Sequence, residues 1–393
     1  MRHRDPVSPP AAELVPVSRT RAPARQVVLP EPRRVAVDPV AQAVGVVALV
    51  PAHNEQSGII ATIRSLQEQT RPPDRIVVVA DNCTDATAAL ALAVGAEVIT
   101  TAGNVHRKAG ALNQALAAVL PDLQDDDVVL AMDADSQLAP DFVATGLRHL
   151  AHLPERGAIS GSYVARDDRT LVGLLQRIEY AQGLHTVHNR GGRIHVLSGA
   201  ACMFTARALR AVATARGSAL LPGPRGWVYH QESLTEDYEL TVALKRIGFA
   251  PLNARDCRVV TDVMTTWHDW RAQRLRWQRG TVETLLMYGW TRHTRTAWVV
   301  QYWTYFRSLV PLLMVLFWAY ALAVETLTFQ PFWLLVVPVF VLDQVVAGWQ
   351  AGARGRVVAA LLVPMWLYDL VQSTVYWRAL LLSLRGGEST WTT

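Results

Sequence analysis

DDDVVLAMDADSQLAP, residues 125–140, joins an apolar run directly to two carboxylates. Residues 128–132 are continuously apolar, which predicts a strand buried within a sheet. Asp133 and Asp135 follow at its carboxyl end, and side chains two residues apart on an extended chain point the same way. Two carboxylates on one face repel each other unless a cation lies beside them. The stretch therefore predicts a charged site at the end of a buried strand.

Similar segments precede this stretch. Apolar strands that end in polar residues are predicted at 44–55, with a break at Pro51, and at 75–85, followed by a short strand at 97–100. Segments with helical spacing separate them, and this alternation predicts an α/β fold with a Rossmann-like, mostly parallel sheet. Ligands bind beyond the carboxyl ends of the strands in such sheets. Here those ends read PAHNE, ADN and DAD, so polar and acidic side chains converge on one edge.

After residue 155 the pattern is less regular. The elements expected there are strands at 158–166 and 193–204 and helices at 171–184 and 233–248. Ser233 with Glu236 fits a capping box at the start of the last helix, and Gly248 is expected to end it.

The C-terminal part of the chain is strongly apolar. Apolar residues make up 51% of the sequence and dominate from about Trp298 onward. Three membrane spans are predicted, at 308–324, 331–349 and 357–377, each close to the length that crosses a bilayer. Arg354 lies between the last two spans, and the positive-inside rule then places the preceding domain in the cytoplasm. We expect a multi-pass protein of the cell (inner) membrane with a cytoplasmic catalytic domain.

Charge and cysteine content exclude several classes of function. The net charge is +5 without a concentrated basic block, which argues against nucleic-acid binding and suits contact with anionic lipid. Three isolated cysteines show no metal-binding or disulfide spacing. No glycine-rich G-x-G-x-x-G follows the first strand, which excludes a dinucleotide-binding dehydrogenase.

Several side chains near the predicted edge suit a phosphate-bearing ligand. Asp133 and Asp135 could hold Mg²⁺ together with substrate phosphate oxygens, although a solvated turn is the alternative. Asp81 ends another strand. Lys108 stands beside the start of a helix, and a lysine with a helix N-terminus suits a diphosphate. An ordinary surface lysine remains the alternative.

Two further segments contain candidate groups. Acids in a first helical turn are favoured by the helix dipole, so Glu236 has a structural as well as a functional interpretation, whereas Asp237 could be a general base. The segment 267–280 alternates tryptophan with arginine at helical spacing. A basic amphipathic helix on the membrane surface explains Trp267, Trp270 and Arg271 in that segment.

The ordered set PAHNE, ADN, KAGALN, DAD, SGA, TED and QRLRW resembles the inverting family-2 glycosyltransferases with a GT-A fold. The resemblance covers roughly residues 44–300 and is greatest to membrane synthases of cellulose, chitin, hyaluronan and poly-N-acetylglucosamine. It implies transfer of a sugar, with N-acetylglucosamine preferred, from a UDP-sugar to a growing polysaccharide.

The resemblance also implies a role for each matching residue. Uracil and ribose would be held by Ala52, His53, Glu55 and Asp81. The nucleotide and its diphosphate would be contacted by Lys108, Asp133, Gln273, Arg274 and Arg276. Asp135, beside Asp133, would bind Mg²⁺ or Mn²⁺, and Asp237 would deprotonate the acceptor hydroxyl. Ser198, Gly199 and Trp277 would border the acceptor, although a tight turn also explains the first two.

Alternatives remain open for the product and the partners. A single-sugar transferase acting on a lipid-linked acceptor and a non-catalytic nucleotide-sugar-binding scaffold are the other two functions considered. A homo-oligomer or an accessory subunit could complete the assembly. The expected organisation is a disordered Pro/Arg-rich tail (1–40), a GT-A domain (41–262), amphipathic interfacial helices (263–297), a transmembrane region of about three helices (298–384) and a short tail (385–393).

Overall fold

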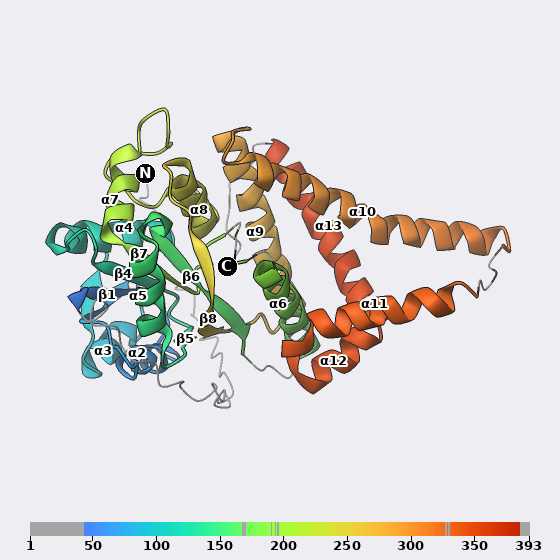
Figure 1. The fold of residues 1–393 in the computed structure, drawn as a ribbon, viewed down its shortest axis with the longest axis horizontal. Helices are drawn as coiled ribbons and strands as arrows, with labels where there is room; N and C mark the ends of the chain where they lie inside the picture. Colours follow the sequence, from blue (N-terminus) through green and yellow to red (C-terminus); the bar gives the residue numbers. More distant parts are fainter. Residues whose placement is uncertain are drawn as a thin grey trace, which may run out of the picture.

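The computed structural model describes residues 43–166, 170–189, 191, 192, 194, 196–326, 328 and 331–385. The predicted tail at 1–40 lies outside the described residues, as does the C-terminal tail apart from Arg385. An α/β domain forms one side of the molecule, and long helices from the C-terminal part extend away from it (Figure 1).

A single sheet of eight strands forms the centre of the α/β domain. Its strands in spatial order are β3 (Glu97–Thr100), β2 (Arg75–Ala80), β1 (Val46–Ala52), β4 (Val128–Met132), β7 (Ala201–Thr205), β6 (Ala158–Ala165), β8 (Leu252–Thr261) and β5 (Gln137–Leu138). The first four of these run parallel, as expected from the alternation of strands and helices.

The second half of the sheet differs from the prediction of a mostly parallel sheet. β7 is antiparallel to both β4 and β6, and β5 is antiparallel to β8, so the sheet is mixed. The reversal matters for the site because it pairs Met132, at the end of β4, with Ala201, at the start of β7. The DAD segment after β4 and the SGA segment before β7 are therefore neighbours.

Helices cover both faces of the sheet. On β1, Val47 and Leu49 face one hydrophobic core, and Val46, Ala48 and Val50 face the other. The helices of the domain are α2 (Ile59–Gln67), α3 (Thr87–Ala93), α4 (Arg107–Val119), α5 (Phe142–His152), α6 (Leu171–Asn189), α7 (Ala206–Ala215) and α8 (Glu236–Arg246). Continuous apolar strands follow from this arrangement, because both faces are buried.

Local details correct three predictions. β1 does not break at Pro51 but continues to Ala52, since the proline occupies a paired position opposite Val79. The strand expected at 193–204 begins only at Ala201. The capping box is absent: Thr235 is the N-cap of α8, and no side chain caps the helix.

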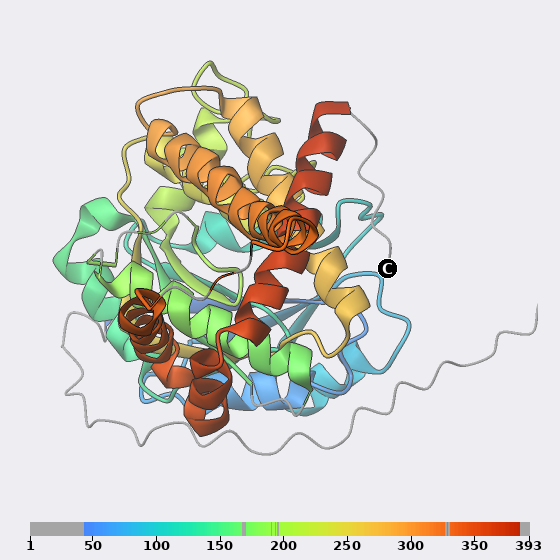
Figure 2. The same cartoon turned by 90° about the vertical axis from the view of Figure 1, so that its right-hand side faces the viewer.

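The C-terminal helices form a separate layer beside the domain (Figure 2). They are α9 (Trp267–Tyr288), α10 (Arg295–Ala323), α11 (Trp333–Ala347), α12 (Gly352–Ala360) and α13 (Val363–Arg385). α13 packs against α9 and α10. Side chains of α6, α9, α12 and α13 form one buried apolar cluster. Trp270 of α9 is completely buried in that cluster, so its predicted place on a membrane surface is wrong.

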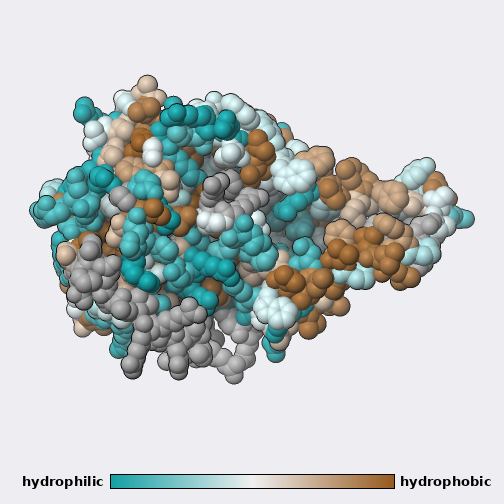
Figure 3. All heavy atoms as spheres, in the orientation of Figure 1, coloured by the Kyte–Doolittle hydropathy of each residue, from teal (hydrophilic) through white to brown (hydrophobic). Residues whose placement is uncertain are grey.

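The prediction of three membrane spans is not supported. Among the described residues, α10 alone is long and apolar enough to cross a bilayer, and the pair α11–α12, bent by 64°, would make a second candidate if taken as one span. α13 interrupts its apolar residues with Asp369 and Arg378. Apolar side chains dominate the projecting ends of α10 and α11 in Figure 3.

Candidate functional site

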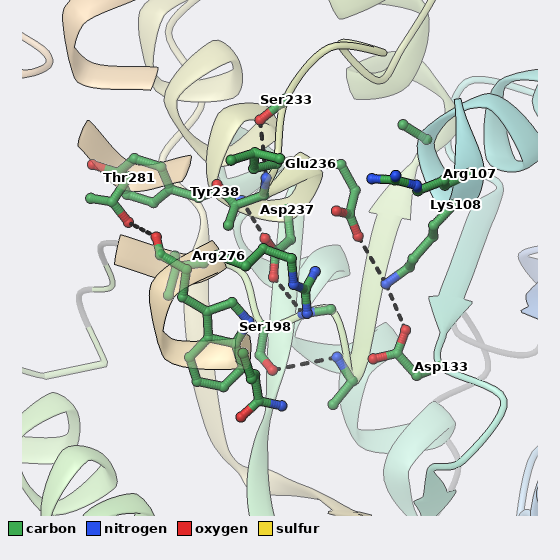
Figure 4. A pocket seen from close by; sticks show the side chains of 18 of the residues that line it. Arg107, Lys108, Asp133, Ser198, Ser233, Glu236, Asp237, Tyr238, Arg276 and Thr281 are labelled. Carbon is green, nitrogen blue, oxygen red and sulfur yellow. Dashed lines mark hydrogen bonds and ion pairs between the residues drawn. The ribbon is translucent and has the colours of Figure 1, made fainter. Parts of the chain in front are cut away.

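A cavity of about 790 Å³ opens at the carboxyl edge of the parallel strands, between the sheet and α9 (Figure 4). A volume of this size accommodates a ligand of several rings. Predicted site residues that line it are Lys108, Asp133, Asp135, Ser198, Gly199, Glu236, Asp237, Gln273, Arg276 and Trp277. Residues more than 150 positions apart in the sequence thus meet around one space.

Lys108 lies at the centre of the charged part of the cavity. Its Nζ is 2.6 Å from Asp133 Oδ1 and 3.1 Å from Glu236 Oε1. Burial alone would lower the pKa of Lys108, but the charges of Asp133, Glu236 and Asp237 together raise it well above its ordinary value. Lys108 lies in the first turn of α4, whereas the sequence pattern placed it just before the helix.

Gly199 marks the point where these groups approach most closely. Its amide donates a hydrogen bond to Asp237 Oδ2 over 3.1 Å. A Cβ atom at this position would lie 2.9 Å from Lys108 Nζ and 3.3 Å from Asp237 Oδ2. A side chain here would displace the ammonium of Lys108, so the glycine lets the SGA segment, α4 and α8 meet at these distances.

The two acids at the start of α8 have opposite pKa shifts. Burial and the neighbouring charge of Glu236 raise the pKa of Asp237 to about 6. Burial alone would raise the pKa of Glu236, but the charges of Lys108 and Arg276 lower it below the ordinary value. Glu236 is thus held as an anion beside Lys108, whereas Asp237 can exchange a proton near neutral pH.

Asp135 lies in a strongly negative part of the cavity. Burial and the charges of Asp133, Asp262 and Glu55 raise its pKa to about 7. Asp262 was not predicted from the sequence, because it follows β8 without a motif around it. No group of three or more His, Cys, Asp or Glu side chains is arranged to hold a metal ion within the described part of the chain.

Two arginines also line the charged part of the cavity. Arg107, next to Lys108, and Arg276 of α9 both border the cavity. Burial and the charge of Arg276 lower the pKa of Arg107, so the two guanidinium groups are close enough to repel each other. Arg107 was not predicted from the sequence, and its position beside Lys108 is the local signal that could have indicated it. Its backbone has a left-handed φ of 52°.

Other predicted residues lie near the cavity without lining it. Asp81 is buried and accepts hydrogen bonds from Asn104 Nδ2 and Thr101 Oγ1, each over 2.8 Å. The Nδ1 atom of His53 lies 2.6 Å from the carbonyl oxygen of Asp81. Ala52 ends β1, and Glu55 follows it at the same edge of the sheet. These four residues lie at or just after the carboxyl ends of β1 and β2.

Arg274 lies outside the cavity, unlike its predicted neighbours in QRLRW. Its side chain is only 2% exposed, and its guanidinium pairs with Glu179 of α6, with 2.5 Å between Nη2 and Oε2. The expected contact with a diphosphate has no geometric support, because the guanidinium faces α6 and not the acids of the cavity. Tyr163 and Tyr180, which line the cavity near this network, were not predicted.

The part of the cavity next to α10 is uncharged. Thr281 of α9 and Ala297, Val300 and Gln301 of α10 line it, and none of them is charged. The site thus combines a charged half, suited to an anion with a cation, and an uncharged half that reaches the apolar helix α10. Such a cavity could bind a polyanion beside a neutral hydroxyl-bearing group and supply a carboxylate base.

Comparison with known proteins agrees with the resemblance seen in the sequence. Residues 47–212 match the family model described as glycosyl transferase family 2. The chain is 24% identical to the poly-beta-1,6-N-acetyl-D-glucosamine synthase of Staphylococcus aureus over 252 residues, covering 62% of this chain and 56% of the synthase. It is 27% identical to a probable glycosyltransferase of Bacillus subtilis, YdaM, over 253 residues, covering 61% and 56%.

The chain spans little more than half the length of these curated relatives. A solved mannosyltransferase from Pyrobaculum calidifontis, in complex with GDP-Man and Mn²⁺, is similar over 91% of this chain and 92% of its own, with a TM-score of 0.58 and 17% identity. At that identity the likeness concerns the fold. The predicted family resemblance and the GT-A-like α/β domain are confirmed.

Proposed function

Because the chain carries a glycosyl transferase family 2 domain over residues 47–212, we propose that it transfers a sugar from a nucleotide-sugar donor to an acceptor hydroxyl in the cavity. The observation that carries this proposal is the meeting of Lys108, Glu236 and Asp237 around Gly199 at the edge of the sheet. These groups provide a cation for a leaving diphosphate and a carboxylate of suitable pKa within one space.

The residues divide between the two halves of the reaction. Lys108, Arg107 and Arg276 stabilise the negative charge that develops on the departing diphosphate. Asp237, with its pKa near 6, accepts the proton of the attacking hydroxyl. Attack opposite the leaving group inverts the anomeric centre in one displacement. Glu236 keeps the ammonium of Lys108 in place.

The acids at the end of β4 suit a divalent cation shared with the donor. Asp135 is half-buried beside other carboxylates, and the charge of a cation would relieve their repulsion. Mg²⁺ is commonly held by one or two carboxylates together with substrate phosphates, which fits the small number of protein ligands here. Asp135 and Asp133 would hold Mg²⁺ or Mn²⁺, which when bound neutralises diphosphate charge.

A UDP-sugar, with N-acetylglucosamine as the sugar, and a growing polysaccharide are the proposed donor and acceptor. Similarity to the poly-N-acetylglucosamine synthase supports this choice. The uridine would be held by Asp81, His53, Glu55 and Ala52, at the carboxyl ends of β1 and β2. Ser198, Gly199 and Trp277 would border the acceptor sugar.

A second candidate is transfer of one sugar to a lipid-linked acceptor. The uncharged half of the cavity reaches α10, the helix apolar enough to enter a bilayer, so an acceptor could arrive from the membrane side. Membrane attachment through α10, with the α/β domain in the cytoplasm, belongs to both candidates.

The test is nucleotide release by the purified full-length chain. A panel of UDP-sugars and GDP-mannose is supplied with and without Mg²⁺ or Mn²⁺, and wild type is compared with Asp237→Asn. We expect release from one UDP-sugar that requires the cation and falls at least about a hundredfold in the variant. Release from no donor would contradict the proposed function, and a normally active variant would contradict the role of Asp237. Product length separates a polymerase from a single-sugar transferase.

A further inference from the structure

Arg274 touches two residues of the cavity wall without entering the cavity itself. Its Nη1 donates a hydrogen bond to Gln273 Oε1 over 3.2 Å. Its guanidinium carbon lies 4.4 Å from the centre of the Trp277 ring, a stacking distance for a cation and an indole. Gln273 and Trp277 both line the cavity. A single buried guanidinium thus contacts the residues on either side of it along α9.

The guanidinium of Arg274 is in turn held from α6 and α13. Glu179 of α6 accepts from Arg274 Nη2 over 2.5 Å, from the Tyr368 hydroxyl over 2.6 Å and from Gln372 Nε2 over 3.1 Å. The Tyr368 hydroxyl accepts a hydrogen bond from Trp270 Nε1 over 2.7 Å. Three helices that are distant in sequence therefore converge on one carboxylate.

We propose that Arg274 is a positioning residue that fixes the ring of Trp277 at the acceptor side of the cavity and steadies the amide of Gln273 in the cavity wall. Glu179, Tyr368 and Gln372 hold Arg274 in place. This inference rests on the proposed function, because it assigns Trp277 to the acceptor. It also connects α13, outside the α/β domain, to the orientation of a ring in the cavity wall.

The geometry favours positioning over ligand binding. The guanidinium of Arg274 pairs with a carboxylate through Nη2, donates to an amide through Nη1 and stacks one face on an indole. Its Nε is buried without a hydrogen-bond partner among the described residues, so the side chain is held by two of its nitrogens and one face. Trp277 is 36% exposed, and the guanidinium of Arg274 lies over one face of its ring. Side chains that hold a binding residue in its productive rotamer affect function through that residue.

Arg274→Met and Tyr368→Phe test the proposal, with Arg271→Met as the control. Arg271 is an exposed arginine one turn earlier on the same helix. Oxidation of Trp277 by a tryptophan-specific reagent, read by peptide mass spectrometry, reports the freedom of the ring without requiring turnover. We expect oxidation at least about threefold faster in Arg274→Met, a smaller increase in Tyr368→Phe and none in Arg271→Met. Unchanged oxidation in both network variants would overturn the proposal.

Kinetics provide the second readout, with an N-acetylglucosamine tetramer as acceptor probe and the donor that wild type uses. We expect the ratio of sugar transfer to donor hydrolysis to fall about tenfold in Arg274→Met, while the donor KM stays within about twofold. Arg276→Met, by contrast, should raise the donor KM. A raised donor KM in Arg274→Met with an unchanged transfer ratio would show that Arg274 binds the donor.

If Arg274→Met does not fold, as judged by its thermal midpoint, Tyr368→Phe tests the proposal with the same two readouts. Wild type that turns over no donor contradicts the proposed function alone, since the oxidation experiment still decides the role of Arg274.

Discussion

Lys108 and Asp133 form an ion pair, with 2.6 Å between Nζ and Oδ1, that connects the first turn of α4 to the residue after β4. The same ammonium is 3.1 Å from Glu236 Oε1, so Lys108 forms ion pairs with both Asp133 and Glu236. An anionic ligand that entered the cavity would compete for this ammonium. The ion pair therefore keeps the acids of the site together, and the diphosphate of the proposed donor would replace one of these contacts.

Replacing Lys108 by glutamine is expected to lower kcat/KM for the donor by at least about a hundredfold. The change removes the charge nearest to three carboxylates, and interactions of this kind with a leaving group contribute several kcal/mol. Loss of the ammonium also removes a group that lowers the pKa of Asp237, so the acid limb of the pH profile should move to higher pH. A fully active variant with an unchanged profile would contradict the central place of Lys108.

Activity is expected to fall as the pH decreases through about 6. The pKa of Asp237 is raised to about 6 by burial and by Glu236, and only the deprotonated carboxylate can accept a proton. Nucleotide release measured between pH 5 and about pH 8, at saturating cation, should give one acid limb near this value. Saturating cation is needed because Asp135, with a pKa near 7, titrates in the same range when no cation is bound. A flat profile down to pH 5 would argue against Asp237 as the base.

The parallel half of the fold and the convergence of PAHNE, ADN and DAD were predictable because they depend on local patterns. Buried strands are apolar throughout, helices have their own spacing, and parallel strands bring their carboxyl ends to one edge. The direction of β7 depends on its pairing with β4, about 70 residues earlier, and no local pattern encodes such a long-range contact.

The division of α9 into cavity-lining and buried residues was only partly predictable. Gln273, Arg276 and Trp277 were predicted for the site, whereas the burial of Trp270 and Arg274 was not. The helix carries arginine and tryptophan on adjacent faces, so Trp270 and Arg274 resemble Arg276 and Trp277 in every local respect. Only the packing of α6 and α13 buries the first pair and leaves the second at the cavity. The third predicted span, 357–377, is not supported because it crosses the break between α12 and α13 and because α13 contains Asp369 and Arg378.

Gly199→Ala is expected to reduce activity strongly with little loss of stability. The new methyl group would lie 2.9 Å from Lys108 Nζ, and the flexible lysine would move away from its carboxylates. Gly183→Ala in α6 is the matched control, since its Cβ would meet only Tyr163 Oη at 3.9 Å. We expect nucleotide release to fall about tenfold or more in the first variant, with thermal midpoints of both variants near that of wild type. Equal activity of the two variants would show that the close approach at Gly199 is not needed.

Association with lipid vesicles is expected to depend on α10. Leu313 and Leu316 of this helix are 57% and 66% exposed, and burial of such side chains in hydrocarbon is favourable. Arginine at position 313 costs about 2.5–3.5 kcal/mol at the centre of a membrane helix. Leu313→Arg should therefore reduce co-flotation with vesicles, whereas Leu92→Arg, at an exposed position in α3, should not. Equal flotation of both variants would place the contact elsewhere.

Arg216→Met is expected to destabilise the α/β domain by about 3–5 kcal/mol, because it leaves a buried carboxylate without its partner. Both Arg216 and Glu239 are fully buried, with 2.7 Å between Nη1 and Oε1. Glu239 is two residues after Asp237 on α8, so the pair also anchors the helix that carries the proposed base. Urea titration followed by circular dichroism measures the loss.

Arg75→Met, which breaks an exposed pair with Glu97, should cost less than about 1 kcal/mol. The double variant Arg216→Met, Glu239→Gln should recover part of the loss, since it removes the stranded charge. A double variant less stable than Arg216→Met would mean that Glu239 stabilises α8 through its other partner, the hydroxyl of Tyr288.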